Sequence, residues 1–297
     1  MNKVGIVILN YGTPKETCDL VLKIKDYEKL NRIVVVDNPC GDNSASLISK
    51  FINKLHNEKI SLIISKENGG YAKGNNIGLR QLVEIEKCDI CFIANPDISF
   101  EESDFEEILK VFNKYKEYGV LTCKRIVSDG SKLRQYWKLP SYADILSDKF
   151  FLLRKIHKEN EVYTINSKNE VIDTQIAPGA FWGVRSDLLI SVNFLDENTF
   201  LFYEENCFAK RIEKTGVKIG LVTKAQYCVL AGKASTEEMK RNGKMMKFLH
   251  DSQRHYVIEY LNIHGVKLFI YDILCVYNSF ELLISGLRKK NKRKGNL

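Results

Sequence analysis

Short apolar runs alternate with amphipathic stretches along the N-terminal third of the chain. Apolar runs rich in β-branched residues predict buried strands at 4–9, 32–36, 60–64 and 91–94. Between these runs, apolar side chains recur at helical spacing over 15–30, 43–55 and 71–86. This order of strand, loop and helix predicts an α/β fold with a Rossmann-like, mostly parallel central sheet flanked by helices.

Polar residues follow three of the predicted strands. They are Asn10, Asp37 and the turn Asn95-Pro96-Asp97. Ligands of open α/β sheets bind just beyond the carboxyl ends of strands, so we expect these tips to meet in one site. They suit ribose hydroxyls, base N–H groups and a cation, and Asp97 could hold a divalent cation against a diphosphate. From its position alone, Asp97 could equally cap a turn.

The second half of the chain is less regular. A helix is predicted at 101–118 and a strand at 120–126, followed by a turn at 128–130. Residues 131–173 mix aromatic residues with lysines, and either a functional loop or a variable surface excursion fits them. The glycines of ENGGYAKGNNIGL (67–79) permit close backbone approach before a helix whose start could face a phosphate, although a plain loop also fits.

Composition is that of a globular protein, with 297 residues of which 44% are hydrophobic. Eight scattered cysteines suggest reduced thiols, and Cys88-x-x-Cys91 is read as core packing rather than a metal site. We expect no signal peptide and no spanning helix, because every long apolar stretch is interrupted by charge.

The positive charge is concentrated at the C-terminus. Residues 236–264 look helical and polar, and the apolar stretch 265–287 is interrupted by charged and polar residues. Six cations then follow: Arg288, Lys289, Lys290, Lys292, Arg293 and Lys294. This pattern is typical of a segment that lies on an anionic membrane surface, although a solvated tail is the alternative. The remaining chain is close to neutral, which argues against a nucleic-acid-binding surface.

Several motifs, in order, resemble the family-2 glycosyltransferases. They are VILNYGT, VVVDN, ENGGYAKGNNIGL, ANPD, APGAFWGVRSDLL and NFLDENTFLFYEENCFAKRIEKTG. The resemblance covers roughly residues 3–235 and is strongest to the bacterial rhamnosyltransferase-like group that builds surface polysaccharides. It implies a GT-A fold over 1–235, with a nucleotide-sugar half (1–100) and an acceptor half (101–235). Residues 236–297 would form a C-terminal helical region with a membrane-proximal basic tail.

The resemblance also implies roles for individual residues. Glu205 would be the catalytic base, and Asp97 would ligate Mg²⁺ or Mn²⁺. The nucleotide-sugar would contact Asn10, Gly12, Asp37, Asn38, Gly70, Lys73, Asn75 and Asn95. The acceptor and sugar pocket would include Gly179, Ala180, Trp182 and Glu204, with Trp182 either a sugar-stacking floor or a core residue.

The sequence departs from the family pattern at a few positions. Asn95 replaces the first carboxylate of the usual metal motif, and the base is Glu where relatives carry Asp. Cys207 stands where relatives tend to have Asp, and the segment 227–235 lacks the usual His, which Lys233 could replace. A shifted register that uses Asp196-Glu197 instead of Glu204-Glu205 also remains open.

The resemblance implies inverting transfer of a sugar, with rhamnose as one candidate, from a UDP- or dTDP-sugar to a saccharide acceptor. The chemistry needs a carboxylate at the attacking hydroxyl and a cation on the leaving diphosphate, with no second nucleophile. The acceptor would be lipid-linked, in bacterial capsule synthesis, and the protein cytoplasmic and peripheral at the inner face of the membrane. Alternatives are a nucleotidyltransferase, and a non-catalytic relative acting as a membrane-surface scaffold.

Overall fold

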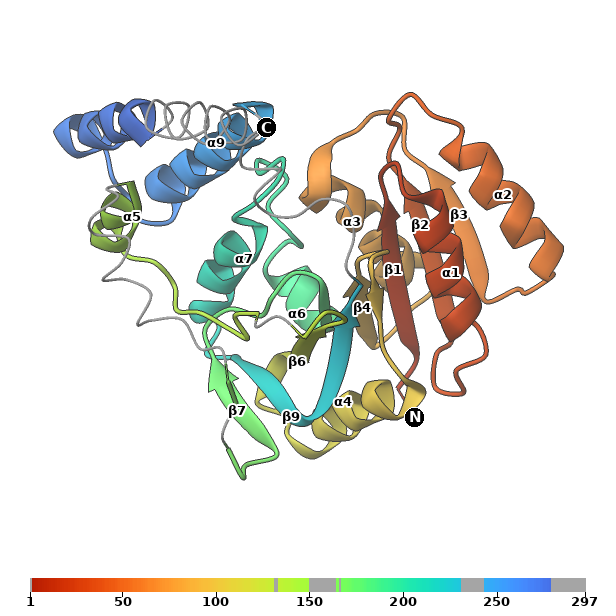
Figure 1. The fold of residues 1–297 in the computed structure, drawn as a ribbon. Coiled ribbons are helices and arrows are strands. Elements are labelled where there is room, and N and C mark those ends of the chain that lie inside the picture. Colours follow the sequence, from red (N-terminus) through yellow and green to blue (C-terminus); the bar gives the residue numbers. More distant parts are fainter. Residues whose placement is uncertain (1, 131–132, 150–163, 166, 231–242, 279–297) are drawn as a thin grey trace, which may run out of the picture.

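The computed structural model describes residues 2–130, 133–149, 164–165, 167–230 and 243–278. Its centre is a nine-stranded sheet in the order β3-β2-β1-β4-β8-β6-β9-β5, with β7 pairing with β9 (Figure 1). The strands of the N-terminal half are β1 (Val4–Asn10), β2 (Arg32–Asp37), β3 (Ile60–Ile64), β4 (Ile90–Ala94) and β5 (Ile98–Ser99). Those that follow are β6 (Tyr118–Val127), β7 (Val171–Thr174), β8 (Phe181–Arg185) and β9 (Lys218–Val229).

The predicted parallel sheet is confirmed in the N-terminal half. Strands β1, β2, β3 and β4 are all parallel, with β1 between β2 and β4. The next neighbour, β8, runs antiparallel to both β4 and β6. The first half therefore sends its loops to one sheet edge, and β8 brings its own start, at Phe181, beside the end of β4.

Helices cover both faces of the sheet (Figure 1). The N-terminal ones are α1 (Pro14–Ile24), α2 (Ser44–Leu55), α3 (Gly70–Arg80) with a π-helical extension (Gln81–Ile85), and α4 (Glu102–Lys114). The later ones are α5 (Tyr142–Lys149), α6 (Ser186–Ser191), α7 (Glu204–Glu213) and α9 (Gly243–Glu259), followed by a helix over 265–278. None of the described helices is both long and apolar enough to cross a membrane.

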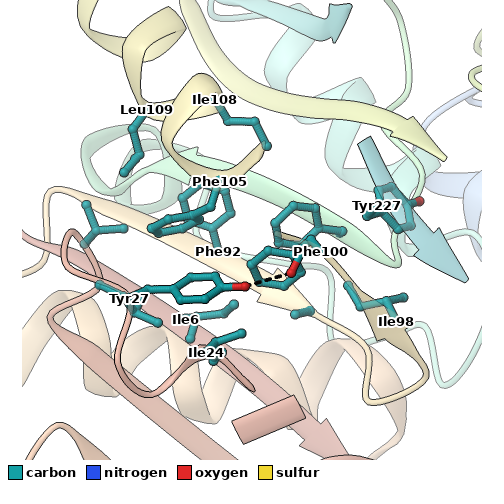
Figure 2. Packing of buried hydrophobic residues seen from close by; sticks show 14 of the residues in the cluster. Ile6, Ile24, Tyr27, Phe92, Ile98, Phe100, Phe105, Ile108, Leu109 and Tyr227 are labelled. Atoms are coloured by element: carbon teal, nitrogen blue, oxygen red, sulfur yellow. Dashed lines mark hydrogen bonds between the residues drawn. The ribbon is translucent and has the colours of Figure 1, made fainter. Parts of the chain in front are cut away.

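Two helices end earlier than the sequence predicts. The first ends at Ile24 instead of residue 30, because the chain then makes successive turns that bury Tyr27. The Tyr27 hydroxyl donates a 2.7 Å hydrogen bond to the Phe100 carbonyl, and both rings pack with Phe92 and Phe105 (Figure 2). The other ends at Lys114 because Tyr118 already begins strand β6. Tertiary burial thus overrides the helical spacing at both ends.

The C-terminal helices form a third packed layer on the acceptor half. Helix α9 contacts α7, and a cluster centred on Ile145, Cys207, Tyr256 and Tyr271 joins α5, α7, α9 and the 265–278 helix. Figure 1 shows these helices beside α7 and away from β1–β3. The boundary predicted at residue 235 lies outside the described residues.

Candidate active site

The polar ends of β1, β2 and β4 lie at one edge of the sheet, as the sequence predicts. Asn10 pairs with Asp37 in the β1–β2 register, and β4 ends beside β1 with Ala94 opposite Ile8. Since β1 separates β2 from β4, the ends of the latter two are about 10 Å apart. Asp37 and the Asn95–Asp97 turn are therefore close enough to serve one ligand.

Asp37 is held by its neighbours at the strand ends. It is almost fully buried, and its Oδ1 accepts hydrogen bonds from the Asn10 side-chain amide (2.5 Å) and the Ser44 hydroxyl (2.9 Å). This network connects the ends of β1 and β2 to the start of α2. Its contact with a base or ribose stays a prediction. Gly12 lies nearby with φ +69°, in a loop beside Cys40.

The glycine loop joins the donor half to the loop that precedes α7. Gly70 has φ +85°, and a Cβ on it would lie 2.1 Å from the Phe200 carbonyl oxygen. The next N–H, of Tyr71, donates a 2.8 Å hydrogen bond to that same oxygen. On its other side, the Asn38 side-chain amide donates to the Gly70 carbonyl at 3.1 Å. Only glycine fits this contact.

Two further predicted donor residues lie on α3. Asn75 is fully buried and donates to the Tyr71 carbonyl at 3.0 Å, while its Oδ1 has no hydrogen-bond partner within the described residues. Lys73 is partly exposed and forms a 2.6 Å ion pair with Glu67. A phosphate would have to compete with Glu67 for this lysine.

A cleft of about 690 Å³ opens on the acceptor side of the sheet edge. Its walls come from the end of β4 (Asn95), the approach to β8 (Gly179, Ala180) and residues 201–206. Tyr71 of α3, side chains of 134–148 and Leu249 of α9 complete them. The Asn95 N–H donates to the Ala180 carbonyl at 2.9 Å, which connects the predicted metal motif to this cleft.

Glu204 and Glu205 enter the cleft from the first turn of α7. The two residues before the helix, Phe202 and Tyr203, both have positive φ values (71° and 67°). Consecutive bulky residues in this region are strained, and such strain concentrates at functional sites. The strained turn directs both carboxyl groups into the cleft, at a helix N-terminus that favours negative charge.

The two carboxyl groups differ in their surroundings. Burial raises the pKa of Glu205, while a 3.0 Å hydrogen bond from the Gly179 N–H and the charges of Arg125 and Arg134 oppose that rise. Burial and the charge of Glu205 raise the pKa of Glu204 strongly, and its Oε1 has no partner within the described residues. The pKa is therefore raised more at Glu204 than at Glu205, which makes Glu205 the carboxyl group that loses its proton more readily.

Tyr71 lies at the centre of this arrangement. Its hydroxyl donates a 2.5 Å hydrogen bond to the Gly179 carbonyl. Burial raises its pKa well above the usual value, with further contributions from the charges of Glu205, Glu204 and Asp97. Tyr71 lines the cleft together with Asn95, Glu204 and Glu205, whereas Asp97 is not among the lining residues.

The surroundings of Asp97 fit a cation that takes most of its ligands from substrate. Burial, and secondarily the charge of Glu16, raise the pKa of this carboxyl, so a positive ion beside it would be stabilising. Within the described residues no three His, Cys, Asp or Glu side chains converge as a metal cage. Mg²⁺ commonly uses one or two carboxylates plus phosphate oxygens and water, and Asp97 with Asn95 meets that requirement.

Trp182 is a core residue and not a sugar-stacking floor. Its ring is buried in β8 and packs on Phe208 with 5.0 Å between ring centroids. It follows Phe181 on a strand whose two faces are both covered. The indole is therefore turned into the core, and the assignment of this residue to the sugar pocket is wrong.

Asp196 and Glu197 are structural. Asp196 is buried, and its Oδ2 lies 2.7 Å from His255 Nε2, 2.5 Å from the Tyr260 hydroxyl and 3.1 Å from Arg211. Glu197 accepts hydrogen bonds from Asn76 and Arg80. Neither lines the cleft within the described chain, so the shifted register is excluded.

Sequence reasoning missed several cleft residues. The sequence predicts Tyr71 only as the first residue of a helix, although its position directly after Gly69-Gly70 is a signal for a site residue. The segment 134–148 contributes Arg134, Trp137 and Asp144; its unusual mix of aromatic and charged residues was the available sign. The Arg134 guanidinium stacks 4.1 Å from the Trp137 ring centre. Lys233 and the basic residues 288–294 lie outside the described residues.

Comparison with known proteins identifies the class to which this site belongs. The sequence profile described as glycosyl transferase family 2 matches residues 5–192, and the chain belongs to this family. A curated relative is the low-salt glycan biosynthesis hexosyltransferase Agl10 of Haloferax volcanii, 22% identical over 221 residues. That alignment covers 74% of this chain and 64% of the relative, so the chain spans less than two thirds of its length.

Solved structures establish the GT-A fold. The mannosyltransferase PcManGT of Pyrobaculum calidifontis, in complex with GDP-Man and Mn²⁺, superposes with a TM-score of 0.60 at 13% identity. The match covers 97% of this chain and 75% of that one. GalNAc-T7 with UDP, GalNAc and Mn²⁺ superposes with a TM-score of 0.61 at 13% identity, and the match covers 88% of this chain and 49% of that one. S. aureus TarS 1-349 superposes with a TM-score of 0.53 at 13% identity, and the match covers 94% of this chain and 80% of that one.

Proposed function

We propose that the protein is an inverting glycosyltransferase that moves a sugar from a nucleotide-diphosphate donor to a saccharide hydroxyl. The observation that carries this proposal is the placement of Glu205 in one cleft with Asn95 and Tyr71. Family membership supports it. The named relatives include a hexosyltransferase and structures solved with GDP-Man or with UDP.

The donor would lie along the edge formed by Asn10, Asp37 and the glycine loop. Its diphosphate would reach the Asn95–Asp97 turn, where Asp97 and Asn95 would hold Mg²⁺ or Mn²⁺. Such a cation stabilises negative charge on a leaving diphosphate. The Mn²⁺ in two structural neighbours supports this assignment.

The acceptor would enter the cleft from the side of residues 134–148. Glu205 would accept the proton of the attacking hydroxyl while that oxygen displaces the nucleotide diphosphate at the anomeric carbon. The Gly179 N–H fixes the carboxylate, and Glu204, whose raised pKa favours the protonated form, would donate a hydrogen bond to a sugar oxygen. Because the base activates the acceptor directly, one displacement inverts the anomeric centre and no covalent intermediate forms.

The finer parts of the proposal rest on the sequence. They are a UDP- or dTDP-sugar donor, with rhamnose as one candidate sugar, and a lipid-linked acceptor in bacterial surface polysaccharide synthesis. They also include a cytoplasmic location at the inner face of the membrane. A panel of nucleotide-sugars with Mn²⁺ in a thermal-shift assay would identify the donor, because a ligand that binds the native state raises the melting temperature.

The decisive experiment compares wild type with Glu205→Gln in transfer and in donor hydrolysis. We expect a loss of about 10²–10⁴ in turnover, with the nucleotide-induced rise in melting temperature retained. Glu213→Gln, at the exposed end of the same helix, is the matched control and should keep full activity. Equal rates for wild type and Glu205→Gln would reject the mechanism. No transfer by wild type with any donor that it binds would favour the non-catalytic alternative.

A further inference from the structure

The helix over 265–278 is apolar on two opposite faces. Its inner face contributes Tyr271 and Cys275, which are buried against α5, α7 and α9. The Tyr271 hydroxyl donates to the His250 carbonyl at 3.2 Å, and Arg254 forms a two-bond ion pair with Asp272. These contacts fix the rotation of the helix about its axis.

The outer face is apolar and exposed. Val266, Phe269 and Val276 are 75%, 65% and 72% exposed, and Ile270, Ile273 and Tyr277 are also exposed. Spacings of three and four residues place all six on one stripe of the helix. We call this set the outer stripe. A soluble surface rarely carries a contiguous apolar stripe without a binding role.

The sequence extends the same spacing beyond the described residues. Phe280, Leu283, Ile284 and Leu287 fall on the same helical period as the outer stripe, and six Lys and Arg residues follow at 288–294. Continuous apolar periodicity with an adjacent basic cluster is the pattern of segments that lie in the interface of anionic membranes. A second protein surface would require no such run of cations.

We propose that the outer stripe is a membrane-docking surface that inserts into the headgroup region of anionic lipid. The inference gives a particular face to the membrane association in the proposed function, and it does not depend on the transfer chemistry. Leu249 of α9 lines the cleft, and α9 shares a buried cluster with the helix over 265–278 that carries the outer stripe. Docking would therefore hold the acceptor side of the cleft near the lipid surface.

Vesicle flotation of the full chain tests the proposal. Wild type should float with vesicles of phosphatidylcholine plus phosphatidylglycerol, and less with phosphatidylcholine alone. High salt should weaken the binding to the mixed vesicles, since salt screens surface charge. The variant Phe269→Ser/Ile273→Ser/Val276→Ser should lose about tenfold or more in lipid affinity. Its melting temperature should not fall, because these side chains are exposed.

The matched control is Ile64→Ser/Ile85→Ser/Ile190→Ser, three equally exposed apolar residues on other elements, which should float like wild type. Failure of wild type to float, or equal flotation of the outer-stripe variant, overturns the proposal. A wild-type dimer in sedimentation that becomes a monomer in the variant, with no lipid binding by either, would assign the stripe to a second copy instead. None of these measurements uses turnover, so they leave the test of Glu205 unaffected.

Discussion

The main-chain N–H of Gly179 donates a 3.0 Å hydrogen bond to Oε1 of Glu205. This bond joins the approach to β8 with the first turn of α7, and it fixes one oxygen of the carboxyl group proposed as the base. The space beside it is too small for a side chain, since a Cβ on Gly179 would lie 2.2 Å from that oxygen. The position of the carboxylate and the identity of residue 179 are therefore coupled.

Gly179→Ala should lower turnover without unfolding the protein. The new methyl group would push the Glu205 carboxyl out of place, and a displacement of about 1 Å at a catalytic group can cost roughly 10²-fold in rate. Steady-state kinetics with a melting curve would measure both effects. Combining it with Glu205→Asp, whose shorter side chain leaves room for the methyl group, should cost less than the sum of the two single changes. If the losses of turnover in Gly179→Ala and Glu205→Asp were additive, the contact between residue 179 and Glu205 would not control the position of the carboxylate.

The acid limb of the pH–rate profile should lie above the pH at which an ordinary glutamate titrates, about 4.3. Burial raises the pKa of Glu205, and only the deprotonated form acts as a base. Activity is therefore lost as pH falls through this raised pKa. An acid limb at or below the ordinary glutamate value would contradict the assignment.

Glu204→Gln should be tolerated far better than Glu205→Gln. The pKa of Glu204 is raised well above its usual value by burial and by the charge of Glu205; this shift favours the neutral carboxyl group, which an amide resembles. We expect a loss of less than about tenfold at neutral pH, against 10²-fold or more for Glu205→Gln. The reverse order would make Glu204 the base.

Gly70→Ala should be more destabilising than Gly41→Ala. Both glycines have positive φ (+85° and +83°), but a Cβ at Gly70 would meet the Phe200 carbonyl, while no atom of the described residues lies within 4 Å of a Cβ at Gly41. An alanine at either position meets the same backbone strain, of order 1 kcal/mol. The difference between the two losses of unfolding free energy therefore measures the clash of the Gly70→Ala methyl group with the Phe200 carbonyl. Urea unfolding would measure it, and equal losses would mean that the Gly70–Phe200 contact relaxes freely.

Asp196→Asn should cost about 2–4 kcal/mol of stability at neutral pH. Burial alone would raise the pKa of Asp196, but hydrogen bonds from His255, Tyr260 and Asn198 and the charge of Arg211 lower it below its usual value. The stabilisation is complete above the ordinary aspartate pKa, about 3.9, and disappears as pH falls through the depressed folded-state pKa. The difference in unfolding free energy between wild type and Asp196→Asn should therefore become smaller in acid. Exposed Asp26→Asn is the control, and a gap independent of pH would refute the ionic contribution.

The sequence predicted the donor half closely because its signals are local. Strand β3 has the predicted bounds, and the ends of β1 and β2 differ by one residue. Polar tips at three buried strands were enough to place Asn10 beside Asp37. Parallel pairing of neighbouring strands brings their carboxyl ends, and the polar residues that follow them, to one edge of the sheet.

The acceptor side could not be predicted in the same way. The insertion of β8 between β4 and β6 is a long-range pairing that no local pattern encodes. The burial of Trp182 follows from that pairing, and so does the contact between Gly179 and Glu205. Helices 15–30 and 101–118 were predicted too long for a related reason, because the packing of Tyr27 and the start of β6 at Tyr118 decide where they end.

The buried anion at Asp196 has an evolutionary consequence. Besides Asn198, its partners come from two helices that pack against each other: Arg211 lies on α7, and His255 and Tyr260 lie on and just after α9. Losing any one donor would weaken the compensation of this buried charge, so we expect substitutions at these positions to occur together. In an alignment of homologous sequences, positions 196, 211, 255 and 260 should covary more strongly than the positions of a surface ion pair such as Lys210 and Glu213.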